Sequence, residues 1–496
     1  MLHGKVSVRA AARCAAVWAN LGTEWGGPKE APERSGTGRV TPETRHGDEG
    51  GWPRPGPMCW GGVPTFEGGR AQALRSLVEV GGRRIHSMAT SDISAARRPM
   101  KFASARSVAR DPKVAAREGY RLLSERLEAS PDIIFLYATE TYDTAAVNAH
   151  LVALAGEVPI HGGTSCQGVM TDEGMASEEG HGLAMMGIAD AEGAYGVGAW
   201  EIGDSPREAA QRALQEALSQ AGRPGQVPQM LWLMAAPGVE EELIEGIQQL
   251  LGSRVPILGG SSADNTVAGH WKQFANGEVF ENAVVIAAIF SSADVDYSFH
   301  SGYEPTARVG RVTRAQGRVL YEIDDQPAAQ VYNAWTGGAI DDELEQGGNI
   351  LGKTTLFPLG RVVGRIEGTP YYQLSHPDGL TPEGGLTLFS TVEEGEELVL
   401  MRGTVDSLIS RAGRVGQAVR DIASSEDKEI VGSLVIYCAG CMLTVQERID
   451  EVAREMGEVL GGKPYIGAFT FGEQGCFIGG ENRHGNLMIS VVTFLS

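Results

Sequence analysis

The stretch His161–Met175, HGGTSCQGVMTDEGM, combines four glycines, three serine or threonine residues and one cysteine, and it follows an apolar segment. Glycine tolerates positive φ and allows a backbone to approach a ligand closely. Four interpretations of this turn are open: a nest for a nucleophile, a cradle for phosphate, a metal site, or the wall of a pocket for a small molecule. The sequence around it narrows the choice.

The same arrangement occurs three times after residue 130. Each copy has an apolar, β-rich run, a helix-like segment, a turn with proline, glycine and small polar residues, and a closing apolar run. The opening runs are DIIFLYAT (132–139), MLWLMAAP (230–237) and SLVIYCAG (433–440). The turns are VPIHGGTSCQG (158–168), VPILGGSSADN (255–265) and KPYIGAFTFGEQG (463–475). The closing runs are GLAMMGIAD (182–190), AVVIAAIF (283–290) and NLMISVVTF (486–494).

This order predicts three related βαβ units with Gly-rich turns, in an α/β protein of layered mixed sheets. The opening runs are apolar on both faces, which is typical of buried strands. Asp143 or Thr144 is the expected start of the first helix, and Thr444 with Glu447 has the spacing of a capping box. Residues 301–410 differ, because short strands broken by Gly and Pro indicate an antiparallel sheet segment with a helix from about Pro327.

Charge and composition exclude several classes of function. The net charge of the chain is −21, and residues 1–99, with 14 basic and 9 acidic residues, contribute +5, so the rest carries −26. An acidic body argues against binding to nucleic acid or to anionic membranes. No apolar run approaches the roughly 20 residues that span a bilayer. Six cysteines in 496 residues do not form a disulfide framework, which favours a cytoplasmic location.

Residues 1–99 are expected to be a disordered or wrongly assigned N-terminal extension. The segment is rich in Gly, Pro, Arg and Glu without periodicity, and it lacks the apolar surface that would offset its ordering entropy. Met88 and Met100 are alternative start sites to Met1.

The cysteines offer two thiol-based alternatives. Cys166 lies in the first Gly-rich turn, where a nucleophile would be exposed, but no base can be assigned to it with His161 so near in sequence. Cys438 and Cys441 form a C-x-x-C pair at the predicted end of a strand, which is typical of a redox pair or of buried structural cysteines. A zinc site would need a second C-x-x-C or a pair of histidines, and the sequence has neither at a suitable spacing, so we expect no metal. A phosphate loop would need a lysine after the glycines, and no lysine follows these turns, so we expect no nucleotide cofactor.

The order of LVIYCAG, KPYIGAFTFGEQG and ENRHGNLMISVVTF resembles the C-terminal part of FIST domains. VPIHGGTSCQGVM and VPILGGSSADN resemble the turns of the N-terminal FIST part, and VTRAQGRVLYEIDDQPAAQVY the segment that joins the two. The resemblance covers roughly residues 101–496 and implies a FIST N-terminal domain at 100–320 and a FIST C-terminal domain at 321–496. The chain departs from the family where CAGC replaces a cysteine followed by arginine.

The resemblance implies a stand-alone sensor that binds a small polar metabolite, such as an amino acid, and relays the signal to a separate protein. The family has a similar Gly-Glu, Asn and His to Glu473, Asn482 and His484. A thiol-dependent enzyme and a ligand-free protein-interaction scaffold are the alternatives. The expected ligand-binding residues are those of the turns and of this polar set: His161, Gly162, Gly163, Thr164, Ser165, Gly259, Gly260, Ser261, Ser262, Asp264, Gly467, Thr470, Glu473, Asn482 and His484.

Overall fold

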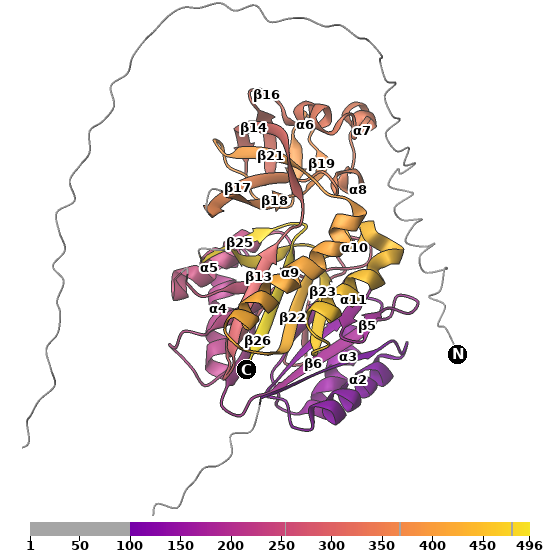
Figure 1. Ribbon diagram of the computed structural model, residues 1–496, viewed down its shortest axis with the longest axis vertical. Coiled ribbons are helices and arrows are strands. Elements are labelled where there is room, and N and C mark those ends of the chain that lie inside the picture. Colours follow the sequence, from indigo (N-terminus) through magenta and orange to yellow (C-terminus); the bar gives the residue numbers. More distant parts are fainter. Residues whose placement is uncertain (1–99, 253, 367–368, 478–479) are drawn as a thin grey trace, which may run out of the picture. The chain divides into compact units, whose positions relative to one another are not determined.

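The computed structural model describes residues 100–252, 254–366, 369–477 and 480–496. The predicted N-terminal extension, 1–99, lies outside these residues. Within them, three six-stranded sheets form the body of the protein, and an antiparallel lobe (residues 304–402) is inserted in the third unit (Figure 1).

The three sheets share one strand order, in which a parallel pair forms the centre. The first runs β1 (Lys101–Ser107), β6 (Leu183–Ala189), β2 (Ile133–Ala138), β3 (Ile160–Thr164), β10 (Gln273–Ala275) and β11 (Glu278–Phe280). The second runs β7 (Ala194–Glu201), β12 (Ala283–Phe290), β8 (Met230–Ala235), β9 (Ile257–Ser261), β24 (Glu473–Phe477) and β25 (Glu481–Gly485). The third runs β13 (Asp294–His300), β26 (Ile489–Leu495), β22 (Ile430–Cys438), β23 (Tyr465–Thr470), β4 (Val169–Thr171) and β5 (Gly174–Ala176). The prediction of an α/β protein with layered mixed sheets is therefore confirmed.

Each Gly-rich turn carries the chain from one sheet to another. The hairpin β4–β5 follows β3 in sequence but pairs with β23 of the third sheet. The hairpin β10–β11 follows β9 but pairs with β3, and β24–β25 follows β23 but pairs with β9. The exchange is cyclic, so every sheet is completed by a hairpin from another unit.

Two glycines of these turns are required by strand packing. A Cβ atom on Gly162 would overlap the carbonyl oxygen of Leu136 on the parallel neighbour β2. Gly259 takes the equivalent place beside Leu233 on β8, and its φ of +146° is one that L side chains rarely adopt. These glycines therefore have an architectural role, whatever the turns bind.

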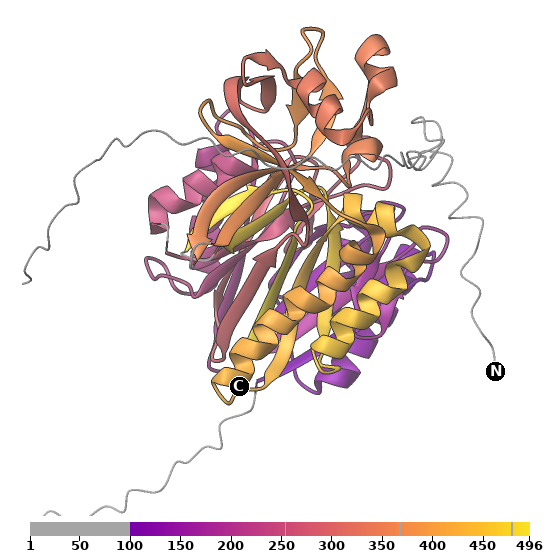
Figure 2. The same ribbon diagram turned by 45° about the horizontal axis from the view of Figure 1, so that its top comes forward.

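Helices cover the outer face of each sheet, and the inner faces pack on one another. The first sheet carries α2 (Pro112–Leu127) and α3 (Thr144–Ala155), the second α4 (Pro206–Gln220) and α5 (Glu240–Leu251). The third carries α9 (Val405–Ser425), α10 (Ala439–Val445) and α11 (Ile449–Val459), of which α9 and α11 lie side by side (Figure 2). Inside, Trp232 of β8 donates to the hydroxyl of Tyr137 of β2 over 2.8 Å.

The helix starts are partly as predicted. Asp143 is the N-cap of α3, and its carboxylate accepts from the backbone N–H of Ala146. The predicted capping box of Thr444 and Glu447 is wrong, because Thr444 lies inside α10 and its hydroxyl donates to the carbonyl of Gly440. A 3-10 turn, η1 (Gln446–Arg448), separates α10 from α11, so the expected single helix is two.

The lobe confirms the predicted antiparallel segment. Its strands are β14 (Glu304–Gln316), β15 (Val319–Ile323), β16 (Gln326–Pro327), β17 (Leu359–Ile366), β18 (Thr369–Ser375), β19 (Pro377–Leu380), β20 (Leu386–Leu388) and β21 (Glu397–Arg402). Helices α6 (Ala328–Thr336), α7 (Asp341–Gln346) and α8 (Leu351–Thr354) accompany them, and α6 has Pro327 as its N-cap, as predicted. The expected division between residues 320 and 321 falls inside β15 and stays a prediction.

Candidate ligand site

The three Gly-rich turns contact one another through backbone hydrogen bonds. The N–H of Cys166 donates to Phe469 over 3.1 Å, and that of Ala263 donates to Thr164 over 3.0 Å. The N–H of Ser261 donates to Gly472 over 2.8 Å. The turn residues of the predicted site are thus brought together, but all of them are buried.

Most side chains of these turns are engaged by the protein itself. Ser165 donates to the carbonyl of Gly168 and accepts from the N–H of Phe469, and Thr164 accepts from the N–H of Lys272. The ring of His161 packs at 5.6 Å from that of Phe135, and burial lowers its pKa to about 3. These residues act as structural groups in the described conformation, and ligand binding by them stays a prediction.

Asp264 and Asn482 are also engaged by backbone. The carboxylate of Asp264 accepts from the N–H groups of four residues of the following loop, Thr266, Ala268, Gly269 and His270. The amide of Asn482 accepts from Ile257 and donates to Val255, each over 2.8 Å. Both side chains hold neighbouring segments in place.

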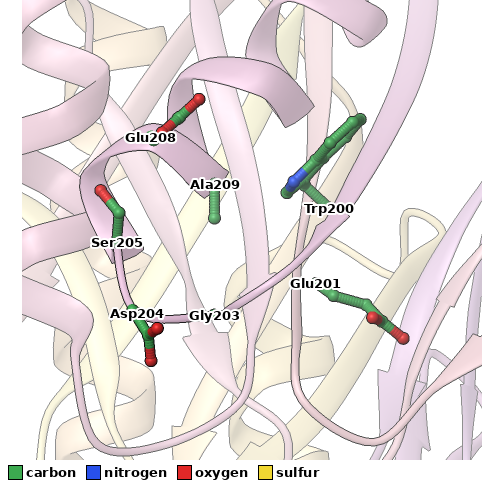
Figure 3. Close-up of a pocket in the computed structure, with 7 residues that line it drawn as sticks. All are labelled: Trp200, Glu201, Gly203, Asp204, Ser205, Glu208 and Ala209. Atoms are coloured by element: carbon green, nitrogen blue, oxygen red, sulfur yellow. The ribbon is translucent and has the colours of Figure 1, made fainter.

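Two cavities are lined by other residues. The first, of about 300 Å³, is a surface hollow between the end of β7 and the start of α4 (Figure 3). Its walls include Trp200, which is 48% exposed, and the acidic residues Glu201, Asp204 and Glu208. Arg212 already stacks on Trp200 and pairs with Glu208, so the hollow has its own cation.

The second cavity, which we call the aromatic cavity, has a volume of about 250 Å³ and lies where the third sheet meets the lobe. Five of its lining residues are phenylalanine or tyrosine, and they come from β13, β18, β24 and the link between β13 and β14. The lining residues are Phe299, His300, Ser301, Tyr303, Pro305, Pro370, Tyr371, Tyr372, Phe477 and Met488. Flat rings and a few polar groups around a concave volume are typical of sites for small molecules.

Arg411 of α9 lies directly behind this wall and is completely buried. Its Nη1 donates to the carbonyls of Ser301 and Leu487 over 2.6 and 2.7 Å. Among the described residues, its Nε and Nη2 have no hydrogen-bond partner, and no carboxylate lies within ion-pair distance. Buried charges are normally paired. This guanidinium lies 4.7 Å from the centroid of the Tyr437 ring and 5.9 Å from that of the Tyr303 ring.

The cysteine pair lies beside Arg411. Cys438 ends β22 and Cys441 follows in α10, and both are buried. Burial opposes ionisation of Cys441, but a hydrogen bond from Cys438 and the charge of Arg411 outweigh it and lower its pKa to about 6. Burial and the thiol of Cys441 raise the pKa of Cys438 well above its usual range. At neutral pH the thiolate form is therefore favoured for Cys441, and the neutral thiol is favoured for Cys438.

Glu473, a member of the predicted polar set, is linked to the aromatic cavity through Met488. Its carboxyl accepts from the backbone N–H of Met488, which lines the cavity, and from the hydroxyl of Thr470. Burial raises the pKa of Glu473 well above its usual range. Glu473 and Arg411 therefore each bind the backbone of a residue that lines the cavity, Met488 and Ser301 respectively.

His484 belongs to a second buried network, between α5 and the lobe. Glu240 accepts from Ser261 over 2.7 Å, and Arg318 binds Glu240 and Glu241 over 2.6 and 2.5 Å. Burial opposes ionisation of Glu241, but nearby His484 and Arg318 outweigh it and lower its pKa to about 2. The network joins the second sheet to the lobe.

Sequence reasoning missed Arg411 and the aromatic wall. Arg411 occupies an apolar position of α9, spaced three and four residues from the buried Leu408 and Val415. An arginine at helical core spacing is a signal that could have been found. The aromatic wall could not have been predicted from the sequence, because its rings come from segments that are distant in sequence and become neighbours only in the folded protein. Among the described residues, no group of three His, Cys, Asp or Glu side chains is placed to hold a metal ion.

Comparison with known proteins gives the class of this chain. The FIST N domain matches residues 132–326 and the FIST C domain matches 328–476, so the chain belongs to the FIST domain family. FIST domains are small-ligand sensory domains of signalling proteins. In the part of the chain that the structure describes, we find no helix with the length and apolar character needed to cross a bilayer.

Individual relatives are distant or matched over a short segment. An uncharacterized protein of Methanocaldococcus jannaschii, MJ1623, is 36% identical over 93 residues, which are 19% of this chain and 18% of that protein. A cyanuric acid hydrolase from A. caulinodans is 11% identical, with a TM-score of 0.29, over 79% of this chain and 99% of its own. PurLQS from Thermotoga maritima is 10% identical, with a TM-score of 0.20, over 80% of this chain and 72% of its own.

Proposed function

We propose that this protein is an intracellular sensor that reversibly binds a small, amino-acid-like metabolite in the aromatic cavity and passes the signal to a separate protein. The observation that carries the proposal is the buried Arg411 behind the cavity wall, with two nitrogens that lack a hydrogen-bond partner among the described residues. A ligand carboxylate in the cavity would be attracted by the charge of this guanidinium.

The other end of such a ligand has a partner as well. An ammonium group near Glu473 would favour the ionised form of this carboxyl, whose pKa is raised by burial. The rings of Tyr303, Tyr371 and Phe477 would enclose an apolar side chain. This arrangement favours a zwitterion with an apolar or aromatic side chain.

The cavity also supplies a route for the signal. Its wall combines residues of the body, such as Phe299 and Met488, with Tyr371 and Tyr372 of the lobe. A ligand that contacts both would favour one arrangement of lobe and body over others. A partner protein that reads the lobe would then respond to the ligand.

The test is a thermal-shift screen of the full chain against L-amino acids, dipeptides and related metabolites. A ligand at one hundred times its dissociation constant should add about 2.7 kcal/mol to the free energy of unfolding. His300→Ala and Tyr371→Ala should remove the shift, and Trp200→Ala, in the other cavity, should keep it. A panel without any shift, or a shift that both cavity variants retain, would contradict the proposal.

A further inference from the structure

Among the described residues, one group near Arg411 can carry a negative charge at neutral pH. Glu473 is held mainly in its neutral form by burial, and the hydroxyls of Tyr303 and Tyr437 have raised pKa values for the same reason. The thiol of Cys441 is the group near Arg411 whose ionised form is favoured. A buried guanidinium and a buried thiolate therefore stabilise each other.

Tyr303 connects this thiolate to the aromatic cavity. Its hydroxyl lies 3.5 Å from the Sγ of Cys441 and 2.8 Å from the carbonyl oxygen of Thr355. Tyr303 also lines the cavity, so the same side chain contacts the sulfur and borders the space where a small molecule can enter. Rotation of this ring would open a path to the sulfur.

Cys438 adds a second thiol at close range. It precedes Cys441 by three residues, and each thiol shifts the pKa of the other. Exchange with a disulfide needs a thiolate that attacks and a second thiol that resolves the mixed disulfide, and Cys441 and Cys438 can take these two roles.

We propose that Cys441 is a covalent modification site for small disulfides that enter through the aromatic cavity, with Cys438 as the resolving thiol. In the first step the Cys441 thiolate attacks one sulfur of R–S–S–R, a mixed disulfide forms on Cys441, and RS⁻ leaves. In the second step Cys438 transfers its proton to the departing sulfur and attacks Cys441, which releases the second RSH. The sum is one protein thiolate, one protein thiol and one disulfide converted to one protein disulfide, RS⁻ and RSH. This site does not depend on reversible binding of a metabolite.

The experiment treats the folded full-length chain with 2-hydroxyethyl disulfide between pH 5 and pH 8 and follows each cysteine by peptide mass spectrometry. The wild-type protein should form a Cys438–Cys441 disulfide, with a rate that reaches half its maximum near pH 6. Cys438→Ser should instead accumulate the mixed disulfide on Cys441. Tyr303→Phe should keep the ring and move the midpoint to higher pH.

Cys476 is the matched internal control. Its sulfur also contacts a tyrosine, Tyr297, over 3.3 Å, but burial raises its pKa. At pH 6 Cys441 should react about tenfold faster than Cys476 or more. Equal rates for the two cysteines, or reaction of Cys441 only after the protein loses its circular dichroism signal, would overturn the proposal.

Discussion

The sequence predicts the position of Glu240 and Glu241 in a helix, but it does not predict their ion-pair partner. Their position in the first turn of a helix is evident from GVEEELIEGIQQLLGS, and acids are favoured there by the helix dipole. The structure adds a stronger partner, Arg318, which is 77 positions away from Glu241. Pairing over such a distance depends on the placement of the lobe, which local sequence does not encode.

The depressed pKa of Glu241 predicts a pH-dependent contribution to stability. Its folded pKa of about 2 is below the ordinary value of 4.5, so the contribution is complete above about pH 4.5 and is lost as pH falls toward 2. We expect Glu241→Gln to lower the free energy of unfolding by about 3 kcal/mol at pH 6, and by progressively less in acid. Urea unfolding at a series of pH values measures this difference.

The control for this prediction is the neighbouring residue. Glu242 is 42% exposed and pairs with Arg207 on the surface, so Glu242→Gln should change the free energy of unfolding by less than about 1 kcal/mol. If the two variants lose stability equally, and equally at all pH values, then the buried network does not stabilise the protein as described.

At the scale of elements, the sequence predicted the repeated units but not the exchange of hairpins. Strands and helices follow from apolar periodicity within each copy, and the glycines mark where the strands end. The hairpins β4–β5 and β10–β11 have strands of only three residues, and their pairing to another unit depends on contacts distant in sequence. Local patterns therefore cannot specify which sheet a hairpin joins.

Two of these hairpins are each held by an asparagine, Asn276 in the turn between β10 and β11 and Asn482 in β25. Asn276 accepts from the N–H of Ile160 over 3.1 Å, and Asn482 accepts from Ile257, which is the equivalent residue of the second sheet. The sequence predicts a place in the ligand site for Asn482, whereas in the structure its side chain binds the backbone of Ile257. An asparagine next to a glycine turn is the same signal whether it binds a ligand or a backbone.

Replacement of either asparagine by alanine should weaken the docking of its hairpin. Each variant leaves backbone groups without a partner, and we expect a loss of about 2 kcal/mol in the free energy of unfolding. The double variant should show the sum within about 0.5 kcal/mol, because the two sites lie in different sheets. Urea titration of the single and double variants measures these losses.

A surface residue provides the comparison for the asparagine variants. Gln249→Ala removes an exposed contact to Gln211 and should change stability by less than about 0.5 kcal/mol. If Asn482→Ala has no more effect than Gln249→Ala, the hairpin is not held as described. If the Asn482→Ala variant keeps its stability but loses ligand binding, then Asn482 contacts the ligand.

At the scale of the whole molecule, the cyclic exchange joins the three units into one body, and the lobe adds the remaining side of the aromatic cavity. The family and the order of the units were accessible from sequence, because short motifs recur at regular spacing. The cavity was not, because its wall combines β13, β18 and β24, which are separated by up to about two hundred residues. Sequence reasoning therefore centred the site on the Gly-rich turns, which the structure shows to be buried against one another.

Hydrogen–deuterium exchange of the full chain with and without a ligand from the screen tests the location of the site most directly. We predict slower exchange in the segments that line the aromatic cavity, around residues 299–303 and 370–372, and in the lobe strands next to them. The hollow at Trp200 should exchange at the same rate in both states. Protection confined to the turns at residues 161–165 and 259–264, with none at the cavity, would contradict the account and return the site to the turns.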